Sequence, residues 1–374
     1  MRALTFDPHA ADSARLEDVG EPPAEDGPVL VETLALGVCG TDLELVAGHL
    51  GFLTTGRGRL ILGHESLGRV TEAPPGSGLA PGDLVAGIVR RRDPVPCLDC
   101  AAGEWDLCTD GRFTERGIIG RDGYGSERFR IEPEFAVKVD PALGLLGVLM
   151  EPASVLAKAW EQIERIGRRG RWAPRRLLVT GAGPIGLLAA LMGAQRGLEV
   201  HVLDRVEGGP KPGLVRDLGA TYHAGPLEGS ADAADVVIEC TGSGPIVVEA
   251  IRRAAPNGIV CLIGAGCGDA PIPTDWDALT GAMIIRNLVV FGSVSANRRH
   301  FEAAAGSLAR ADRGWLARLI TGRFPLDRWR EALGRRPEDV KSIIVMGEEA
   351  RGAAAFGPPR GPRPGPSPSP SSAA

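Results

Sequence analysis

Four side chains of this sequence are of the types that bind a catalytic metal ion. Cys39 ends an apolar run, His64 and Glu65 follow a glycine, and Glu151 stands where a long helical pattern begins. A thiolate, an imidazole and a carboxylate suit a zinc ion that keeps one coordination position open for a substrate. Spacing alone leaves a second interpretation, in which a buried cysteine, a turn histidine and a helix-start glutamate never meet.

The stretch from Leu177 to Asp204 could bind a dinucleotide. An apolar run leads into a G-x-G-x-x-G turn, and a helical pattern and a second apolar run follow. The first glycine allows a tight turn, the second a close approach of a pyrophosphate, and the third close packing of the helix on the strand. The helix N-terminus then presents free N–H groups to the phosphates. The predicted cofactor-binding residues are Gly181, Gly183, Pro184, Ile185, Gly186, Asp204, Arg205 and Thr241.

The charges around Asp204 bear on which nicotinamide cofactor binds. Its carboxylate can accept a hydrogen bond from the ribose 2′-hydroxyl of NAD and repel the 2′-phosphate of NADP. Arg205 beside it and Lys211 beyond it could instead accommodate that phosphate. We expect NAD, with NADP as an alternative cofactor.

The pattern of apolar residues predicts an α/β protein with two parts. Residues 1–152 contain short strand-like runs separated by Gly and Pro, which indicates a mostly β, barrel-like domain. Residues 153–300 alternate strand and helix patterns, which indicates a doubly wound parallel sheet. Residues 300–347 end in a strand candidate that could rejoin the first domain. The Pro-, Gly- and Ser-rich residues 350–374 predict a disordered tail.

Composition and charge exclude several classes of protein. The 374 residues are enough for two domains with sizeable cores. A formal net charge of −5, without a long basic stripe, argues against nucleic acid as the main partner. The arginine clusters at 90–92 and 335–336 are interpreted as solvated surface.

We expect a cytoplasmic protein with no membrane partner. No targeting segment is apparent, and the apolar stretches are too short to cross a bilayer. In the cytoplasm the seven cysteines would be reduced, so clustered cysteines are better interpreted as metal ligands than as disulfides.

Three motifs, taken in order, resemble the zinc-dependent medium-chain alcohol dehydrogenase superfamily. They are Cys-Gly-Thr-Asp from residue 39, Gly-His-Glu from residue 63 and Gly-Ala-Gly-Pro-Ile-Gly from residue 181. Segments 115–118, 151–155 and 294–301 narrow the likeness to its archaeal-type glucose 1-dehydrogenase branch.

This resemblance covers about residues 1–347. It implies a GroES-like, mostly β catalytic domain and a Rossmann doubly wound domain, with the active site in the cleft between them. It also implies oxidation of a sugar or polyol hydroxyl by NAD or NADP, with D-glucose 1-dehydrogenase, which yields gluconolactone, as the leading activity. The family implies a homodimer or a homotetramer.

The resemblance also implies roles for individual residues. Cys39 and His64 match the first two catalytic zinc ligands, and Glu151 matches the carboxylate or amide position of this branch. Glu65 matches an acid that ligates zinc or holds a zinc-bound water or the substrate. Thr41 matches the hydroxyl residue that begins the proton relay. The implied sugar contacts are Glu65, Glu115, Glu151 and Asn297.

A second cysteine group resembles the structural-zinc lobe of the superfamily, which carries four cysteines. Cys97, Cys100 and Cys108 match its last three positions, whereas the first is Pro94, which cannot bind a metal. Asp93 or Asp99 could supply the fourth ligand, because carboxylates also bind zinc. The alternative is a degenerate lobe of three reduced thiols; we favour a bound structural zinc.

One departure from the branch and two other functions stay open. Ser295 stands where the branch often has asparagine, which leaves Asn297 as a candidate substitute or a neighbouring loop residue. The chain could be another medium-chain dehydrogenase, acting on a secondary alcohol, a polyol, an aminocyclitol or a threonine-like substrate. Glu65 with Glu115 favours a substrate with several hydroxyls. The chain could also be a catalytically silent nucleotide-binding redox sensor, in which zinc ligands need not persist.

Overall fold

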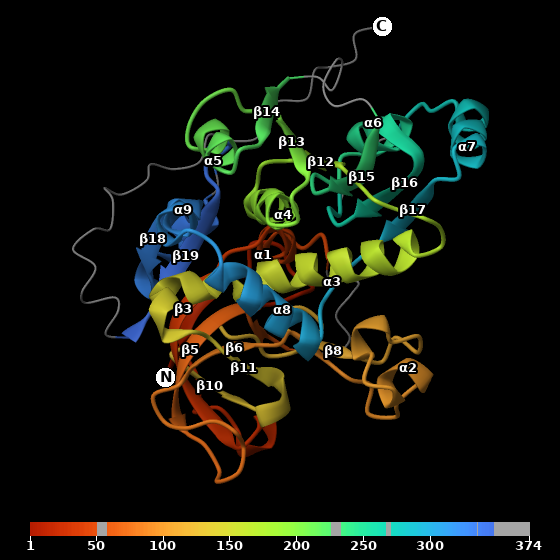
Figure 1. The fold of residues 1–374 in the computed structure, drawn as a ribbon. Helices are drawn as coiled ribbons and strands as arrows, with labels where there is room; N and C mark the ends of the chain where they lie inside the picture. Colours follow the sequence, from red (N-terminus) through yellow and green to blue (C-terminus); the bar gives the residue numbers. More distant parts are fainter. Residues whose placement is uncertain (51–57, 226–232, 267–270, 335, 348–374) are drawn as a thin grey trace, which may run out of the picture.

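Two large sheets, one above the other in Figure 1, organise the fold. The computed structural model describes residues 1–50, 58–225, 233–266, 271–334 and 336–347. The tail predicted at 350–374 lies outside these residues, as do Arg335 and Cys267.

The lower sheet has the strand order β11-β6-β5-β3-β19-β18, and β10 also pairs with β3. Buried and half-buried residues alternate at the start of β3, and its last five residues are all buried because both faces are covered there. These strands are β3 (Val29–Gly37), β5 (Glu65–Glu72), β6 (Leu84–Gly87), β10 (Arg128–Ile131), β11 (Ala136–Lys138), β18 (Ile320–Pro325) and β19 (Lys341–Val345).

Two late strands, β18 and β19, complete the lower sheet, whose other strands come from residues 29–138. β19 pairs antiparallel with β3, with Ile343 opposite Gly37, and β18 runs parallel to β19. Two smaller sheets flank this core, with orders β2-β1-β4 and β7-β8-β9. Their strands are β1 (Arg2–Phe6), β2 (Arg15–Asp18), β4 (Leu60–Ile61), β7 (Arg90–Arg91), β8 (Thr114–Arg116) and β9 (Gly120–Arg121).

The upper sheet is parallel throughout, in the order β14-β13-β12-β15-β16-β17. Its central strands are almost continuously buried, as expected where helices cover both faces. The strand order reverses between β12 and β15, and such a reversal is where ligands bind in doubly wound sheets. The strands are β12 (Arg176–Thr180), β13 (Glu199–Asp204), β14 (Thr221–Ala224), β15 (Ala234–Glu239), β16 (Ala254–Leu262) and β17 (Val289–Gly292).

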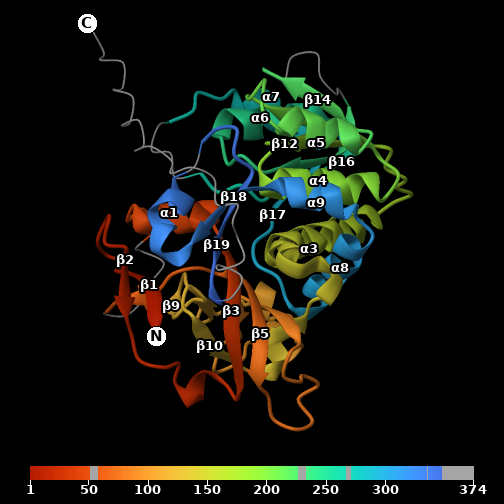
Figure 2. The same ribbon diagram turned by 90° about the vertical axis from the view of Figure 1, so that its left-hand side faces the viewer.

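Two neighbouring helices, α3 and α8, lie between the sheets (Figures 1 and 2). The buried residues of α3 include Leu156, Trp160 and Ile163, three and four positions apart, which is the spacing of one helix face. The helices are α1 (Gly40–Val46), α2 (Leu98–Ala101), α3 (Met150–Gly167), α4 (Pro184–Ala194), α5 (Lys211–Asp217), α6 (Gly244–Arg253), α7 (Trp276–Ile285), α8 (Arg298–Ala309), α9 (Arg313–Leu319) and α10 (Trp329–Leu333).

The helical run Pro141–Gly167 joins a 3-10 segment to α3. It corrects the expectation that every apolar stretch is too short to cross a bilayer. By length and composition it is long and apolar enough to cross a bilayer, and no other helix of the described residues is. Most of its apolar stretch is buried inside the protein, as in a core helix.

Candidate active site

The side chains of Cys39, His64 and Glu65 meet in one cluster. One ligand atom from each residue lies within 4.8 Å of the other two. His64 is 5% exposed and Glu65 is 1% exposed, so the cluster is sheltered from bulk water. The structure therefore brings together a thiol, an imidazole and a carboxylate, the donor types that zinc prefers.

The pairing of β3 with β5 explains why these residues meet. Gly37 at the end of β3 stands opposite Glu65 at the start of β5, so the segments beyond both positions converge. A Cβ atom on Gly37 would lie 2.1 Å from Glu65 Oε2, and only glycine leaves room for that carboxylate. Gly63 adopts a φ of +95°, which favours glycine in the turn that presents His64.

Two buried residues orient the cluster, and the sequence motifs assigned them no role. Asp42 accepts a hydrogen bond of 2.8 Å from the Cys39 backbone N–H, and its other oxygen lies 3.3 Å from His64 Nδ1. This contact leaves Nε2 as the imidazole nitrogen free for a ligand. Lys341, on β19, forms an ion pair with Glu65 and donates to the Val38 carbonyl at 3.0 Å.

The other predicted catalytic-domain residues lie around this cluster at different depths. Thr41 Oγ1 is 3.8 Å from Cys39 Sγ. Glu151 is buried at the start of α3, outside the 4.8 Å group. Burial raises the pKa of its carboxyl to about 7; the charge of His64 lowers this pKa and that of Glu65 raises it. Glu115 is buried and accepts a hydrogen bond of 2.9 Å from Arg90 Nε.

The predicted glycine turn lies at the edge of a cavity of about 680 Å³. Gly181 adopts a φ of +93°, and a Cβ on Gly186 would lie 1.7 Å from the Gly181 carbonyl oxygen. The turn therefore requires glycine at both positions. Of the predicted cofactor residues, Gly181, Gly183, Asp204, Arg205 and Thr241 line the cavity, whereas Pro184, Ile185 and Gly186 lie in α4 outside its lining.

Asp204 is held within this cavity by its neighbours. One carboxylate oxygen accepts from Ala182 N at 2.7 Å and lies 3.3 Å from Lys211 Nζ, and the other accepts from Val206 N at 2.9 Å. Arg205 and Arg336 also line the cavity. Its charged lining therefore comprises one acid and three bases, a positive balance that the residues near Asp204 alone did not reveal.

Glu239 is a further residue of the turn region that the sequence motifs did not identify. Its buried carboxylate accepts hydrogen bonds from the backbone N–H groups of Thr241 and Gly242 at 2.7 and 3.1 Å. Thr241 and Gly242 lie two and three residues beyond the end of β15, so Glu239 fixes the loop at the strand reversal. An acid at the last position of a buried strand is the signal that could have identified it.

The second cysteine group is also assembled, as three thiols. Cys97, Cys100 and Cys108 place their sulfur atoms within 4.8 Å of one another, and this group contains neither Asp93 nor Asp99. A backbone N–H from Cys100 lowers the pKa of the Cys97 thiol to about 6, whereas burial raises the pKa of Cys100 to about 11. Asp93 is occupied elsewhere, because its oxygens accept from Arg112 Nε at 3.0 Å and from Val95 N at 2.8 Å.

Part of the first arginine cluster lies where the sequence interpretation did not place it, and Asn297 has a partner for only one end of its amide. Asn297 Nδ2 donates to Asp106 Oδ1 at 2.7 Å, whereas the buried Asn297 Oδ1 has no hydrogen-bond partner among the described residues, so its sugar contact stays a prediction. Arg90 and Arg91 are buried, in contrast to the solvated surface we expected. The Arg90 guanidinium stacks on Phe113 at 3.8 Å and that of Arg91 on Phe135 at 4.0 Å, which covers these cations with aromatic rings.

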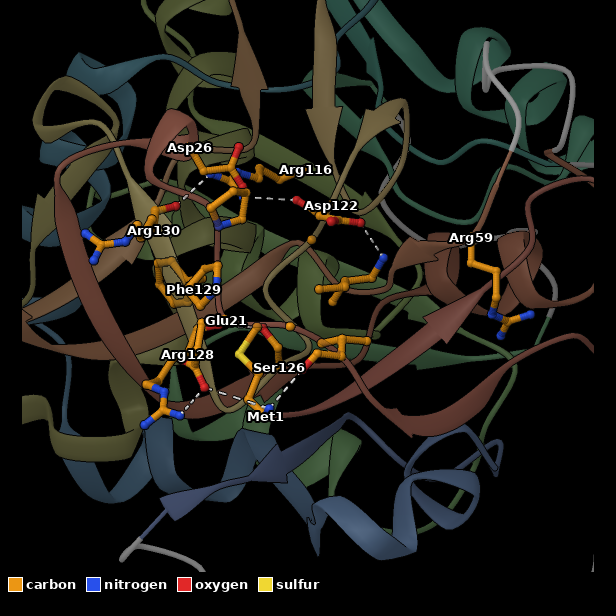
Figure 3. Close-up of a pocket in the computed structure, with 16 residues that line it drawn as sticks. Met1, Glu21, Asp26, Arg59, Arg116, Asp122, Ser126, Arg128, Phe129 and Arg130 are labelled. Carbon is orange, nitrogen blue, oxygen red and sulfur yellow. Dashed lines mark hydrogen bonds and ion pairs between the residues drawn. The ribbon is translucent and has the colours of Figure 1, made fainter.

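A second cavity, of about 230 Å³, is separate from these groups (Figure 3). Two ion pairs lie in its lining: Arg116 Nη1 is 3.4 Å from Asp26 Oδ2, and Arg128 Nη2 is 2.6 Å from Glu21 Oε1. None of the predicted site residues lines it. We therefore leave it outside the candidate site.

Comparisons with known proteins agree with the two halves of this site. Residues 25–141 match the model of the alcohol dehydrogenase GroES-like domain, and residues 144–346 match that of the glucose dehydrogenase C-terminus. The chain belongs to the glucose dehydrogenase family. The motif-based resemblance and the GroES-like plus Rossmann fold class are thus confirmed.

Individual relatives extend over almost the whole chain. Glucose 1-dehydrogenase of Methanocella arvoryzae is 39% identical over 358 residues, which cover 93% of this chain and 100% of that protein. Glucose 1-dehydrogenase of Thermoproteus tenax is 37% identical, covering 92% of this chain and 99% of that protein. The structure of Haloferax mediterranei glucose dehydrogenase in complex with NADP, Zn and gluconolactone matches with a TM-score of 0.85 and 30% identity, covering 93% and 99% of the two chains.

Proposed function

We propose that this protein is a zinc-dependent, NADP-linked dehydrogenase that oxidises the C1 hydroxyl of an aldose, with D-glucose as the leading substrate and its lactone as product. The buried cluster of Cys39, His64 and Glu65 is the observation on which this proposal rests. The zinc, NADP and gluconolactone in the Haloferax mediterranei structure support it.

The cluster fits a zinc ion in its donor chemistry. Cys39, His64 and Glu65 would hold the ion, with Glu151 as a further carboxylate ligand or a contact for the substrate. Bound zinc supplies a Lewis acid for the substrate oxygen. The Thr41 hydroxyl, beside Cys39 Sγ, would accept the proton of the sugar hydroxyl and pass its own proton on to solvent, because a hydroxyl can do both, while the C1 hydride goes to the nicotinamide. Glu115, held by Arg90, accepts hydrogen bonds from other sugar hydroxyls.

The charge balance of the larger cavity favours NADP. Lys211 neutralises Asp204, and Arg205 and Arg336 then leave a positive surface for a 2′-phosphate. The glycine turn at 181–186 would hold the pyrophosphate at the start of α4. Asp204 can still accept a hydrogen bond from the ribose 2′-hydroxyl of NAD, because its carboxylate keeps lone pairs beyond its three contacts. NAD is therefore a second, weaker cofactor.

The three-thiol lobe would hold a second zinc. Cys97, Cys100 and Cys108 supply three ligands, and the contacts of Asp93 leave Asp99 as the carboxylate candidate for the fourth. Reduced thiols and a nicotinamide cofactor suit the cytoplasm, which we propose as the location.

The pairing of the strands supports the domain division that we propose. Residues 1–152, together with the returning strands within 300–347, form the catalytic domain, and residues 153–300 form the cofactor domain. For the assembly we propose a homodimer built at the edge of β17, which pairs with no further strand of the described residues. On neighbouring α7, Ile284 is 76% exposed and Ile285 is 83% exposed, and apolar side chains beside an open strand edge suit a second copy of the chain.

A substrate panel with both cofactors tests the proposal. D-glucose, other aldoses, polyols and simple alcohols would each be mixed with the protein and NADP or NAD, and the absorbance of the reduced nicotinamide followed. We expect the highest kcat/KM with an aldose and NADP, and lactone as the product. Turnover of simple alcohols alone would contradict the sugar assignment, and no turnover of any substrate by zinc-loaded protein would contradict the enzyme assignment.

A further inference from the structure

A buried ion pair joins three distant segments of the chain. Asp106 belongs to the cysteine lobe, Lys158 to α3, and the loop 293–297 connects β17 to α8. Lys158 Nζ lies 2.9 Å from Asp106 Oδ2, and both side chains are almost completely shielded from water. Because burying two charges is costly, such a pair needs further hydrogen bonds around it.

Lys158 and Asp106 have those additional partners. Lys158 Nζ also donates to the backbone carbonyls of Asp106 at 3.1 Å and of Val294 at 2.9 Å. Asp106 Oδ1 accepts from Asn297 Nδ2 at 2.7 Å. The pair therefore fixes the loop at both Val294 and Asn297, one contact through the backbone and one through a side chain.

The same pair reaches the predicted sugar contact. Arg90 Nη1 donates to the Asp106 carbonyl at 3.1 Å, and Arg90 Nε donates to Glu115 at 2.9 Å. One continuous set of contacts thus runs from Glu115, through Arg90 and Asp106, to Lys158 and the loop 293–297.

A histidine continues this set on the far side of the loop. Asn297 N–H donates to His300 Nδ1 at 3.1 Å, so the ring proton must reside on Nε2, which lies 3.1 Å from Glu161 Oε2. Burial lowers the pKa of His300 to about 4, which agrees with a neutral ring. The start of α8 is therefore also fixed by hydrogen bonds.

The loop itself has the features of a ligand contact. It follows the carboxyl end of β17, the edge of a parallel sheet at which ligands gather. The Ser293 and Ser295 hydroxyls are more than nine-tenths buried and have no hydrogen-bond partner among the described residues. Ser295 also has a φ of +63°, a strained conformation for a residue other than glycine. A polar ligand would satisfy both hydroxyls.

We infer that Lys158 and Asp106 are positioning residues that hold the Ser293–Asn297 loop and Glu115 in one fixed arrangement around the substrate and the nicotinamide. This inference rests on the proposed function, because it assigns Glu115 and the loop to that site. It also gives the Asn297 amide nitrogen a supporting role and leaves its unpartnered Oδ1 available for the sugar contact expected from the sequence.

Three variants test the inference, with hydrogen exchange and kinetics as readouts. Lys158→Met removes the cation. The double variant Asp106→Asn, Lys158→Met removes both charges, so that no unpaired charge stays buried. Lys158→Arg keeps the positive charge. In the double variant we expect faster amide exchange at residues 293–297 and at least a tenfold loss of kcat/KM for D-glucose. The Kd for NADP should change less than threefold, because Gly181, Arg205 and Lys211 lie outside this set of contacts. Lys158→Arg should regain most of the protection and activity.

Asp26→Asn is the matched control. Asp26 is the carboxylate partner of buried Arg116 in the second cavity (Figure 3), so this change also weakens a buried ion pair of the catalytic domain. It should lower the melting temperature and leave both the exchange at 293–297 and the KM for glucose unchanged.

The readouts separate failure of this inference from failure of the proposed function. Unchanged exchange at 293–297 in the folded double variant would overturn the positioning role, whatever the activity. A wild-type protein that oxidises no aldose would overturn the proposed function, whereas the exchange measurement would still decide whether the pair holds the loop. A lower melting temperature with unchanged KM and exchange would show a purely structural pair.

Discussion

The charged side chains around Asp204 bear on which nicotinamide cofactor this protein accepts. Asp204 alone favours NAD, but Lys211 lies 3.3 Å from its carboxylate, and Arg205 and Arg336 line the same cavity. Arg336 is distant from the glycine turn in sequence and comes from the segment between α10 and β19. Only the fold brings it there, so the motif around Asp204 could not reveal the positive balance.

Arg336→Ala should therefore impair NADP more than NAD. Loss of one charge-assisted contact to a 2′-phosphate is expected to raise the KM for NADP about tenfold, or about 1.4 kcal/mol, and that for NAD less than twofold. Steady-state kinetics with each cofactor measure the difference. Arg313→Ala, at an exposed position on α9, is the control and should change neither value. An equal increase for both cofactors would place Arg336 away from the 2′-phosphate.

Glu115→Gln should raise the KM for glucose about tenfold while the KM for NADP stays within twofold. The neutral amide replaces a charged acceptor for sugar hydroxyls, and a hydrogen bond to a charged group contributes about 1.5 kcal/mol to binding. Glu132→Gln is the control, because Glu132 likewise pairs with a buried arginine, Arg91, at 3.0 Å. If both variants raise the sugar KM equally, the effect comes from a disturbed ion pair and not from a sugar contact.

At the scale of elements, strands with continuous apolar runs could be predicted and strands without them could not. β12, β13 and β15, at 176–180, 199–204 and 234–239, lie in the part of the chain where the sequence predicts strands that alternate with helices, and each contains an apolar run. β14 reads Thr-Tyr-His-Ala and has no buried residue, and β18 contains Gly322 and Pro325. Both are defined by pairing with a neighbouring strand, which single-sequence periodicity does not contain.

The residues of the candidate site likewise divide into those that a local sequence pattern identifies and those that it does not. The sequence motifs named Cys39, His64 and Glu65, because each stands in a short local pattern. Lys341 and Lys158 were not named, because each acts through a contact with a residue far away in the chain, Glu65 and Asp106 respectively. Isolated lysines in apolar segments have no local pattern that identifies a partner.

The glycine turn provides a prediction for one element. In Gly186→Ala the new Cβ would lie 1.7 Å from the Gly181 carbonyl oxygen, so the turn must move away from the pyrophosphate position. We expect at least a tenfold weaker Kd for NADP, measured by fluorescence titration. Gly213→Ala in α5 is the control: a Cβ there meets nothing within 4 Å, and the helix should gain about 0.5–1 kcal/mol. Unchanged NADP binding by Gly186→Ala would reject the turn as the phosphate site.

For the whole molecule, the order of the strands places the proposed dimer contact next to the proposed positioning loop. β17 is the outer strand of the cofactor sheet, and the loop that follows it leads to the buried pair of Lys158 and Asp106. A second copy paired at β17 would stabilise the strand that supports this loop.

Ile285→Glu should convert the proposed dimer into a monomer. The exposed side chain of Ile285 on α7 would place a charge inside the interface, and burying an unpaired charge is unfavourable. Light scattering after gel filtration measures the mass. Leu98→Glu, at an equally exposed apolar position on the cysteine lobe, is the control and should leave a dimer. A wild-type monomer at micromolar concentration would contradict the proposed assembly directly.

The central claim is that Cys39, His64 and Glu65 hold a zinc ion that the sugar oxidation requires. The most direct measurement is zinc content together with NADPH formation from D-glucose, for wild type and His64→Ala, before chelation, after chelation and after zinc is restored. We predict that chelation abolishes turnover of the wild type and that zinc restores it. His64→Ala should contain one zinc fewer per chain, show at least a thousandfold lower turnover in every state, and bind NADP normally. Wild-type turnover by chelated, zinc-free protein, or full activity of His64→Ala, would contradict the account.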